Sequence, residues 1–78
     1  MTDLKQTLHN IAAAIVDNPE EVNVVVNETE TTLNLTLRVA PDDMGKVIGK
    51  GGRIAKAIRM VIKAAAADCP KKVNVDIR

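Results

Sequence analysis

The chain has 78 residues, 46% of them hydrophobic, and a formal net charge of +1. This length supports one domain with one small core, and the absence of Phe, Tyr and Trp excludes stacking of bases on aromatic side chains. A single Cys69 cannot form an internal disulfide, and no segment has the roughly 20 apolar residues of a membrane span, so we expect a soluble, cytoplasmic domain with no membrane contact.

The first half of the chain predicts a helix and two strands. Asp3 stands at an N-cap position, and apolar residues from Leu4 to Ile15 recur with helical spacing, which predicts an amphipathic helix over residues 3–17. Residues 21–28 predict a strand that is rich in valine, and residues 33–39 predict a second strand because apolar and polar residues alternate strictly. In the first of these strands Val22, Val24 and Val26 share one face, and Val25 lies on the other.

The second half predicts two helices and a third strand. Pro41, Asp42 and Asp43 interrupt the preceding strand and offer caps for a short helical turn over residues 44–48. A glycine-rich stretch at 49–52 separates this turn from a helix over 53–67, and residues 72–77 alternate as a strand. We therefore expect an α+β fold in a single domain over 1–78, with the order α-β-β-α-α-β and helices packed on one face of a three-stranded sheet.

The glycine-rich stretch is the segment most suited to binding. Glycines between two helices permit positive φ angles and close approach of a partner to the backbone. The N-terminus of the following helix presents free amides that attract an anion such as phosphate. From Lys46 to Lys63 the chain has six basic residues and no acidic one, which favours contact with a nucleic-acid backbone.

These residues resemble a known family. Ile48-Gly49-Lys50-Gly51-Gly52, with Ile54 following, resembles the I-G-x-x-G signature of KH domains, whose GXXG loop contacts about four nucleotides. The leading helix resembles the type II KH arrangement, and nearly the whole chain, especially residues 39–59, is similar to the small bacterial KhpA family. This resemblance implies a cytoplasmic RNA chaperone or post-transcriptional regulator that binds single-stranded RNA. It also implies a homodimer, or a heterodimer with a KhpB-like KH protein, and a link to cell elongation, division, cell shape and cell wall biogenesis.

The resemblance places the RNA site on the loop and its flanks. It assigns the RNA backbone to the GXXG loop, and the floor of a groove to apolar residues beside the loop and to the strand at 33–39. Basic residues near the loop add charge. The expected RNA-binding residues are Lys46, Val47, Ile48, Gly49, Lys50, Gly51, Gly52, Arg53, Ile54 and Lys56. We expect no cofactor, metal or catalytic residue.

Two other function classes remain open. The small core and the run Ala64–Ala67, where small residues permit close helix approach, are compatible with a protein-interaction module that works through homo- or heterodimerisation. An enzyme is the least supported class, because the chain has no Ser and shows no recognisable nucleophile, metal cluster or acid–base pair. His9 is interpreted as a surface residue and Cys69 as a small hydrophobic residue at a helix end.

Overall fold

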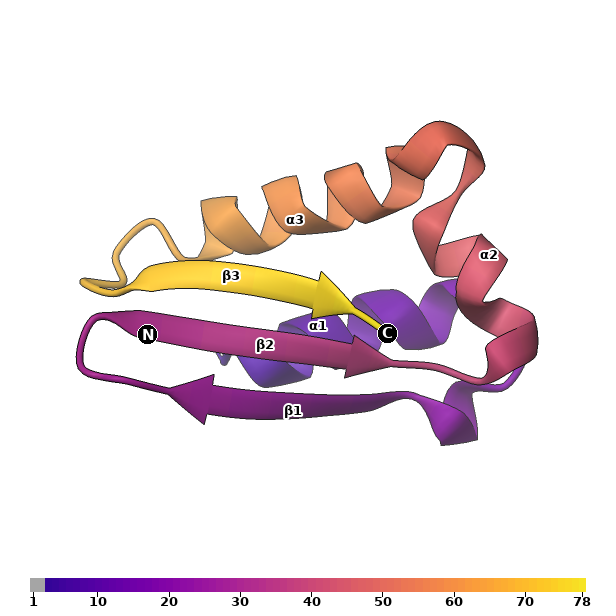
Figure 1. Ribbon diagram of the computed structural model, residues 1–78, viewed down its shortest axis with the longest axis horizontal. Coiled ribbons are helices and arrows are strands. Elements are labelled where there is room, and N and C mark those ends of the chain that lie inside the picture. The colour runs from indigo at the N-terminus through magenta and orange to yellow at the C-terminus, as the bar shows by residue number, and fades with distance from the viewer. Residues whose placement is uncertain (1–2) are drawn as a thin grey trace.

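The computed structural model describes residues 3–78 and contains a three-stranded sheet with helices against one face (Figure 1). The helices and strands are α1 (Leu4–Ile15), β1 (Asn23–Glu28), β2 (Thr32–Arg38), α2 (Met44–Ile48), α3 (Arg53–Ala65) and β3 (Lys72–Ile77), joined in part by the short 3-10 turns η1 (Pro19–Glu21), η2 (Pro41–Asp43) and η3 (Lys50–Gly52). The expected α+β class and the expected order α-β-β-α-α-β are confirmed.

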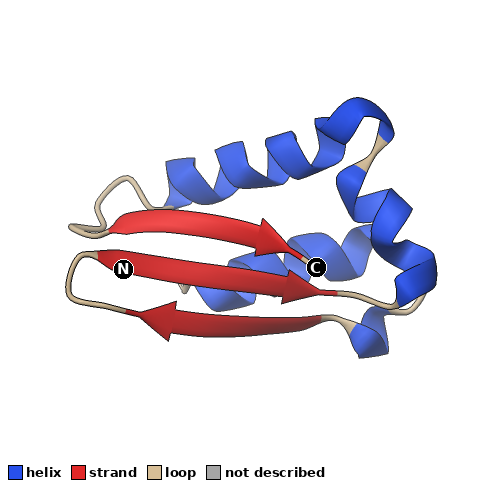
Figure 2. Cartoon of the chain, viewed as in Figure 1, coloured by secondary structure: helices blue, strands red, loops and turns tan. Residues whose placement is uncertain are grey.

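The sheet has the order β1-β2-β3, with β1 antiparallel and β3 parallel to β2. Two adjacent parallel strands need a crossover that returns the chain to the starting end of the sheet. Here α2 and α3 form that crossover (Figure 2). The carboxyl ends of β2 and β3 therefore lie at the same end of the sheet, beside α2 (Figure 1).

The core lies between the sheet and the helices α1 and α3. Alternation along each strand turns one set of apolar side chains toward the helices, and the opposite face of the sheet is polar, with Asn74 Nδ2 donating to Asn34 Oδ1 at 3.0 Å. Because each helix contributes a stripe of apolar residues, one continuous cluster fills the interior. Its buried members are Leu4, Leu8, Ala12, Val16, Val22, Val24, Leu35, Leu37, Val47, Ile58, Ile62 and Val73.

The prediction for the first strand was partly wrong. The strand begins at Asn23 because Pro19–Glu21 forms a 3-10 turn, and Val22 is buried just outside the strand. Val26 is 40% exposed, although it shares its face with the buried Val24. The reason is that Val26 borders an apolar hollow beside Leu4, the first residue of α1.

Asp43 was expected to cap the short helix α2, and this interpretation was wrong. No side chain caps α2, and Asp43 is 1% exposed. Its carboxylate instead accepts hydrogen bonds from the backbone N–H groups of Asp17 and Asn18 at 3.2 and 3.0 Å, and from Asn18 Nδ2 at 3.0 Å. These donors lie just beyond the end of α1, where no helical carbonyl is available to them. Asp43 thus joins the end of α1 to the start of α2.

The charge state of Asp43 follows from these contacts. Burial alone would raise the pKa of the Asp43 carboxyl, but the hydrogen bonds from Asn18 and Asp17 and the positive charge of Lys46 outweigh it and lower the pKa below its usual 3.8. The carboxylate is therefore ionised at neutral pH.

Candidate functional site

The loop between α2 and α3 has a backbone that its glycines make possible. Gly49, Gly51 and Gly52 have φ angles of +75°, +66° and +78°, which other residues rarely adopt. Gly49 N–H donates to the Gly45 carbonyl at 2.8 Å, and Gly52 N–H donates to the Gly49 carbonyl at 3.2 Å. The loop is thus a compact turn with a defined conformation.

The three glycines differ in what surrounds them. A Cβ at Gly49 would lie 2.4 Å from Ile54 Cγ1 and 2.9 Å from Ile54 N, so the loop packs directly against the first turn of α3. At Gly51 and Gly52 a Cβ would meet nothing within 4 Å. Gly49 is therefore required by internal packing, whereas Gly51 and Gly52 leave the backbone open to a molecule approaching from outside.

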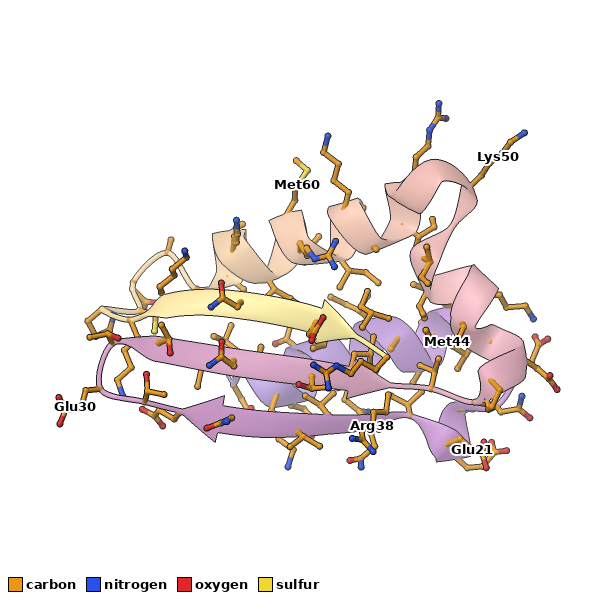
Figure 3. The ribbon with its side chains drawn as sticks, in the orientation of Figure 1. Glu21, Glu30, Arg38, Met44, Lys50 and Met60 are labelled. Atoms are coloured by element: carbon orange, nitrogen blue, oxygen red, sulfur yellow. The ribbon has the colours of Figure 1, made fainter. Side chains whose placement is uncertain are left out.

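Positive charge surrounds this open backbone. Lys50 is exposed and points into solvent at the tip of the loop (Figure 3), and Arg53 is exposed at the start of α3. No side chain caps the N-terminus of α3, so its partial positive charge is not offset by a capping oxygen. This combination of amides, helix dipole and two basic side chains can bind a phosphate.

Helix α3 presents three different faces. Ala55, Ile58 and Ile62 are buried against the sheet. Positions at helical spacing form the other two faces, which we name the cationic flank and the outer face. The cationic flank consists of Lys56, Arg59 and Lys63, and the outer face consists of Ala57, Met60, Val61 and Ala64. Arg59 Nε donates to the Val75 carbonyl at 3.2 Å, which places the cationic flank toward β3.

The apolar residues predicted for the site divide into two groups. Ile48 and Ile54 are each 37% exposed and lie immediately before and after the glycine segment. Val47 is fully buried and supports the loop from inside the core. The first two can touch a ligand, and the third positions them.

Lys46 lies in α2, but acidic residues engage it. Its ammonium forms an ion pair with Asp17 and lies 3.9 Å from Asp43 Oδ1. The hydrogen bond to Asp17 raises the pKa of Lys46. Lys46 is thus directed to the junction of α1 and α2, whereas the exposed Lys50, Arg53 and Lys56 have no ion-pair partner within residues 3–78.

Other residues considered from the sequence are less prominent. His9 is half-buried, and its Nδ1 has no hydrogen-bond partner in the part of the chain that the structure describes. Cys69 is half-buried. Residues 3–78 contain no group of three or more His, Cys, Asp or Glu side chains suited to a metal ion, and no helix within that range has the length and apolar character needed to cross a membrane.

A leading helix, a sheet with the parallel β2–β3 pair and a glycine loop between two helices define this chain as a type II KH-like domain. The family model described as "KhpA/KhpB, KH domain" matches residues 5–77. The chain belongs to the KhpA/KhpB KH family, which confirms the resemblance seen in the sequence.

Relatives and solved structures agree with this assignment. The chain is 58% identical to "RNA-binding protein KhpA" of Clostridium acetobutylicum over 95% of this chain and 99% of that protein. It is 47% identical to the protein of the same name from Halalkalibacterium halodurans over 95% of this chain and 97% of that protein. These relatives are named as RNA-binding proteins and not as enzymes.

The fold also matches the structure of Era in complex with MgGDPNP and nucleotides 1506–1542 of 16S ribosomal RNA. The TM-score is 0.71 at 15% identity, over 95% of this chain and 28% of that one. At this identity the match supports the fold alone.

Proposed function

We propose that this chain binds single-stranded RNA through the segment Gly49–Gly52, as an RNA chaperone or post-transcriptional regulator. One observation carries the proposal: an open glycine backbone lies at the uncapped N-terminus of α3, between the exposed Lys50 and Arg53. The name of the relatives, RNA-binding protein KhpA, supports it.

Each residue of the proposed site has a distinct role. A phosphate lies against the loop amides and the start of α3, where Lys50 and Arg53 balance its charge. Ile48 and Ile54 offer partly exposed apolar surface to the neighbouring bases, and Lys56 contacts the next phosphate. Val47 and Lys46 act indirectly, because the first is buried and the second is paired with Asp17.

A titration of a short single-stranded RNA, read by fluorescence anisotropy, tests this proposal. We expect the double variant Lys50→Asp, Gly51→Asp to lose affinity by more than about tenfold, because it reverses a charge at the phosphate site. Asp is tolerated at the φ of Gly51 better than most residues. The matched control is Lys5→Asp, since Lys5 is exposed on α1.

Folding of each variant is checked by far-UV circular dichroism. Equal RNA affinity of the folded loop variant and the wild type would refute the loop as the RNA site. A second readout is salt: log K should fall linearly with log salt concentration, with a slope of roughly −0.7 per phosphate contacted. A flat salt dependence would refute the phosphate mechanism.

The outer face of α3 favours a second activity, self-association. Met60 is 63% and Val61 49% exposed, Met60 projects away from the sheet (Figure 3), and the small Ala57 and Ala64 beside them permit close approach of another surface. We propose that a second copy, or a KhpB-like KH protein, covers this face. Self-association and RNA binding are compatible because the outer face and the cationic flank point in different directions.

Light scattering tests this second activity. The wild type at tens of micromolar should have a dimeric mass, and Met60→Glu should be a monomer with an unchanged circular dichroism spectrum. A monomeric wild type would contradict self-association. Localisation in the cytoplasm, pairing with a KhpB-like protein and a role in cell elongation and division rest on the family resemblance alone.

A further inference from the structure

The end of α3 opposite the glycine loop has a basic hollow. It has a volume of about 220 Å³ and is lined by Lys63, Ala66, Lys71, Lys72 and Val73. Lys71 is engaged there, because it forms an ion pair with Glu28 and donates to the Thr29 carbonyl at 2.7 Å.

The other two lysines of this basic hollow are available to a ligand. Lys63 and Lys72 are both exposed and have no acidic partner within residues 3–78. They approach the hollow from different elements, one from the last turn of α3 and the other from the start of β3. The fold, and not the sequence alone, therefore places both residues at one hollow.

The cationic flank connects this basic hollow to the glycine loop. Lys56, Arg59 and Lys63 recur at intervals of three and four residues, so they form one row along α3. At about 1.5 Å per residue this row spans roughly 10 Å. Helix α3 runs beside β3 (Figure 1), and Arg59 donates to the Val75 carbonyl, so the row lies on the side of α3 toward β3.

Acidic residues are scarce along this path. Between Lys46 and Lys72 the sequence has one acidic residue, Asp68, which lies in the loop after α3. Asp76 in β3 forms an ion pair with Arg78, which offsets its charge. The path from the loop to the basic hollow is thus positively charged at both ends and along its length.

We propose that Lys63 and Lys72 form a second phosphate-binding position, so that an RNA strand bound at the glycine loop continues beside β3 to the basic hollow. This inference rests on the proposed function and extends it. The loop contacts only about four nucleotides, and a second contact on the same strand adds affinity through effective concentration. The ligand is then a single strand longer than the loop alone can bind.

A simpler role for Lys63 is helix stabilisation. A positive charge in the last turn of α3 interacts favourably with the helix dipole. That role predicts an effect on thermal stability and none on RNA affinity, and it gives no reason for Lys72 to lie at the same hollow. The two roles therefore differ in their readout.

The test compares two RNA lengths on three proteins. Single strands of about four and about twelve nucleotides are titrated against the wild type, against Lys63→Gln, Lys72→Gln, and against the control Lys5→Gln. The control removes a positive charge from an exposed residue of α1 that lies outside the path. All titrations are made well below the melting temperature of each protein, as measured by circular dichroism.

The expected result depends on RNA length. The Lys63→Gln, Lys72→Gln variant should bind the short strand like the wild type and the long strand roughly five- to tenfold more weakly, with a salt slope that is smaller by about 1.4 for two lost contacts. The control should match the wild type with both strands.

Three results would overturn the inference. Unchanged binding of the long strand would show that the lysines make no contact. Equal weakening with both lengths would show a general charge effect and no second position. If the wild type bound neither strand, the proposed function itself would fail. This outcome can be told apart from the first two because it is observed with the wild type alone.

Discussion

Gly49→Ala is the substitution for which the structure gives the most specific expectation. At φ +75° and ψ 172° Gly49 occupies a region that is almost restricted to glycine, where another residue costs about 1–3 kcal/mol. The new Cβ would also lie 2.4 Å from Ile54 Cγ1, and such overpacking costs about 1–3 kcal/mol. Alanine also reduces the conformational entropy of the unfolded chain, which offsets about 0.4–1 kcal/mol of this cost. The net loss is about 1–5.6 kcal/mol, with a midpoint of about 3 kcal/mol.

The other loop glycines give an internal comparison. Gly51 at φ +66° and Gly52 at φ +78° have open space in front of them, so an alanine there meets only the backbone cost of about 1–2 kcal/mol, less the same offset. A domain of this size has a total stability of about 3–5 kcal/mol. Gly49→Ala should therefore lose most of this stability, whereas Gly51→Ala and Gly52→Ala should keep most of it.

Urea denaturation followed by far-UV circular dichroism measures these differences, because the chain has no aromatic residue for fluorescence. The contact with Ile54 is tested by a double-mutant cycle: Ile54→Ala removes Cγ1, so the cost of Gly49→Ala should be smaller in that background. If Gly49→Ala were no more destabilising than Gly51→Ala, the packing argument for Gly49 would be refuted.

Three further predictions concern α2 and its anchor. Gly45→Ala should raise the free energy of unfolding by about 0.5–1 kcal/mol, because Gly45 is helical with open space beside it; a lower urea midpoint would contradict this. The lowered pKa of Asp43 means that its carboxylate stabilises the fold above the unfolded pKa and loses this effect as pH falls through the native pKa. Asp43→Asn should therefore have a lower urea midpoint at neutral pH and a smaller further loss on acidification to about pH 3, and identical acid profiles would exclude this role. Lys46→Gln should leave RNA affinity within about twofold of the wild type, whereas Lys50→Gln should weaken it; the reverse order in anisotropy titrations would assign the phosphate to Lys46.

The fold was largely predictable because its signals are local. Alternation defined β2 and β3 to within a residue or so, and Asp3 caps α1 as expected, accepting a hydrogen bond from the Gln6 N–H. The glycine loop was also visible, because no other residue type suits three positive φ angles. Sequence patterns report well those properties that depend on residues close together in the sequence.

The features that were missed depend on distant contacts. The hydrogen-bond partners of Asp43 are 25 and 26 positions away in sequence, whereas the turn Pro41–Asp43 by itself suggested only a local cap. The ion pair between Lys46 and Asp17 joins residues 29 positions apart, and a run of basic residues alone does not show which of them are free. The placement of Lys63 and Lys72 at one hollow likewise follows from tertiary structure.

The parallel pairing of β2 with β3 has a consequence for how the domain folds. Asn34 and Asn74, which face each other across these strands, are 40 positions apart, whereas β1 and β2 are joined by a short turn. Contacts that close such long loops are slow to form, so we expect the β1–β2 hairpin to form early and β3 to dock late. The path beside α3 is complete only after docking, and amide hydrogen exchange should show its residues among the last to gain protection.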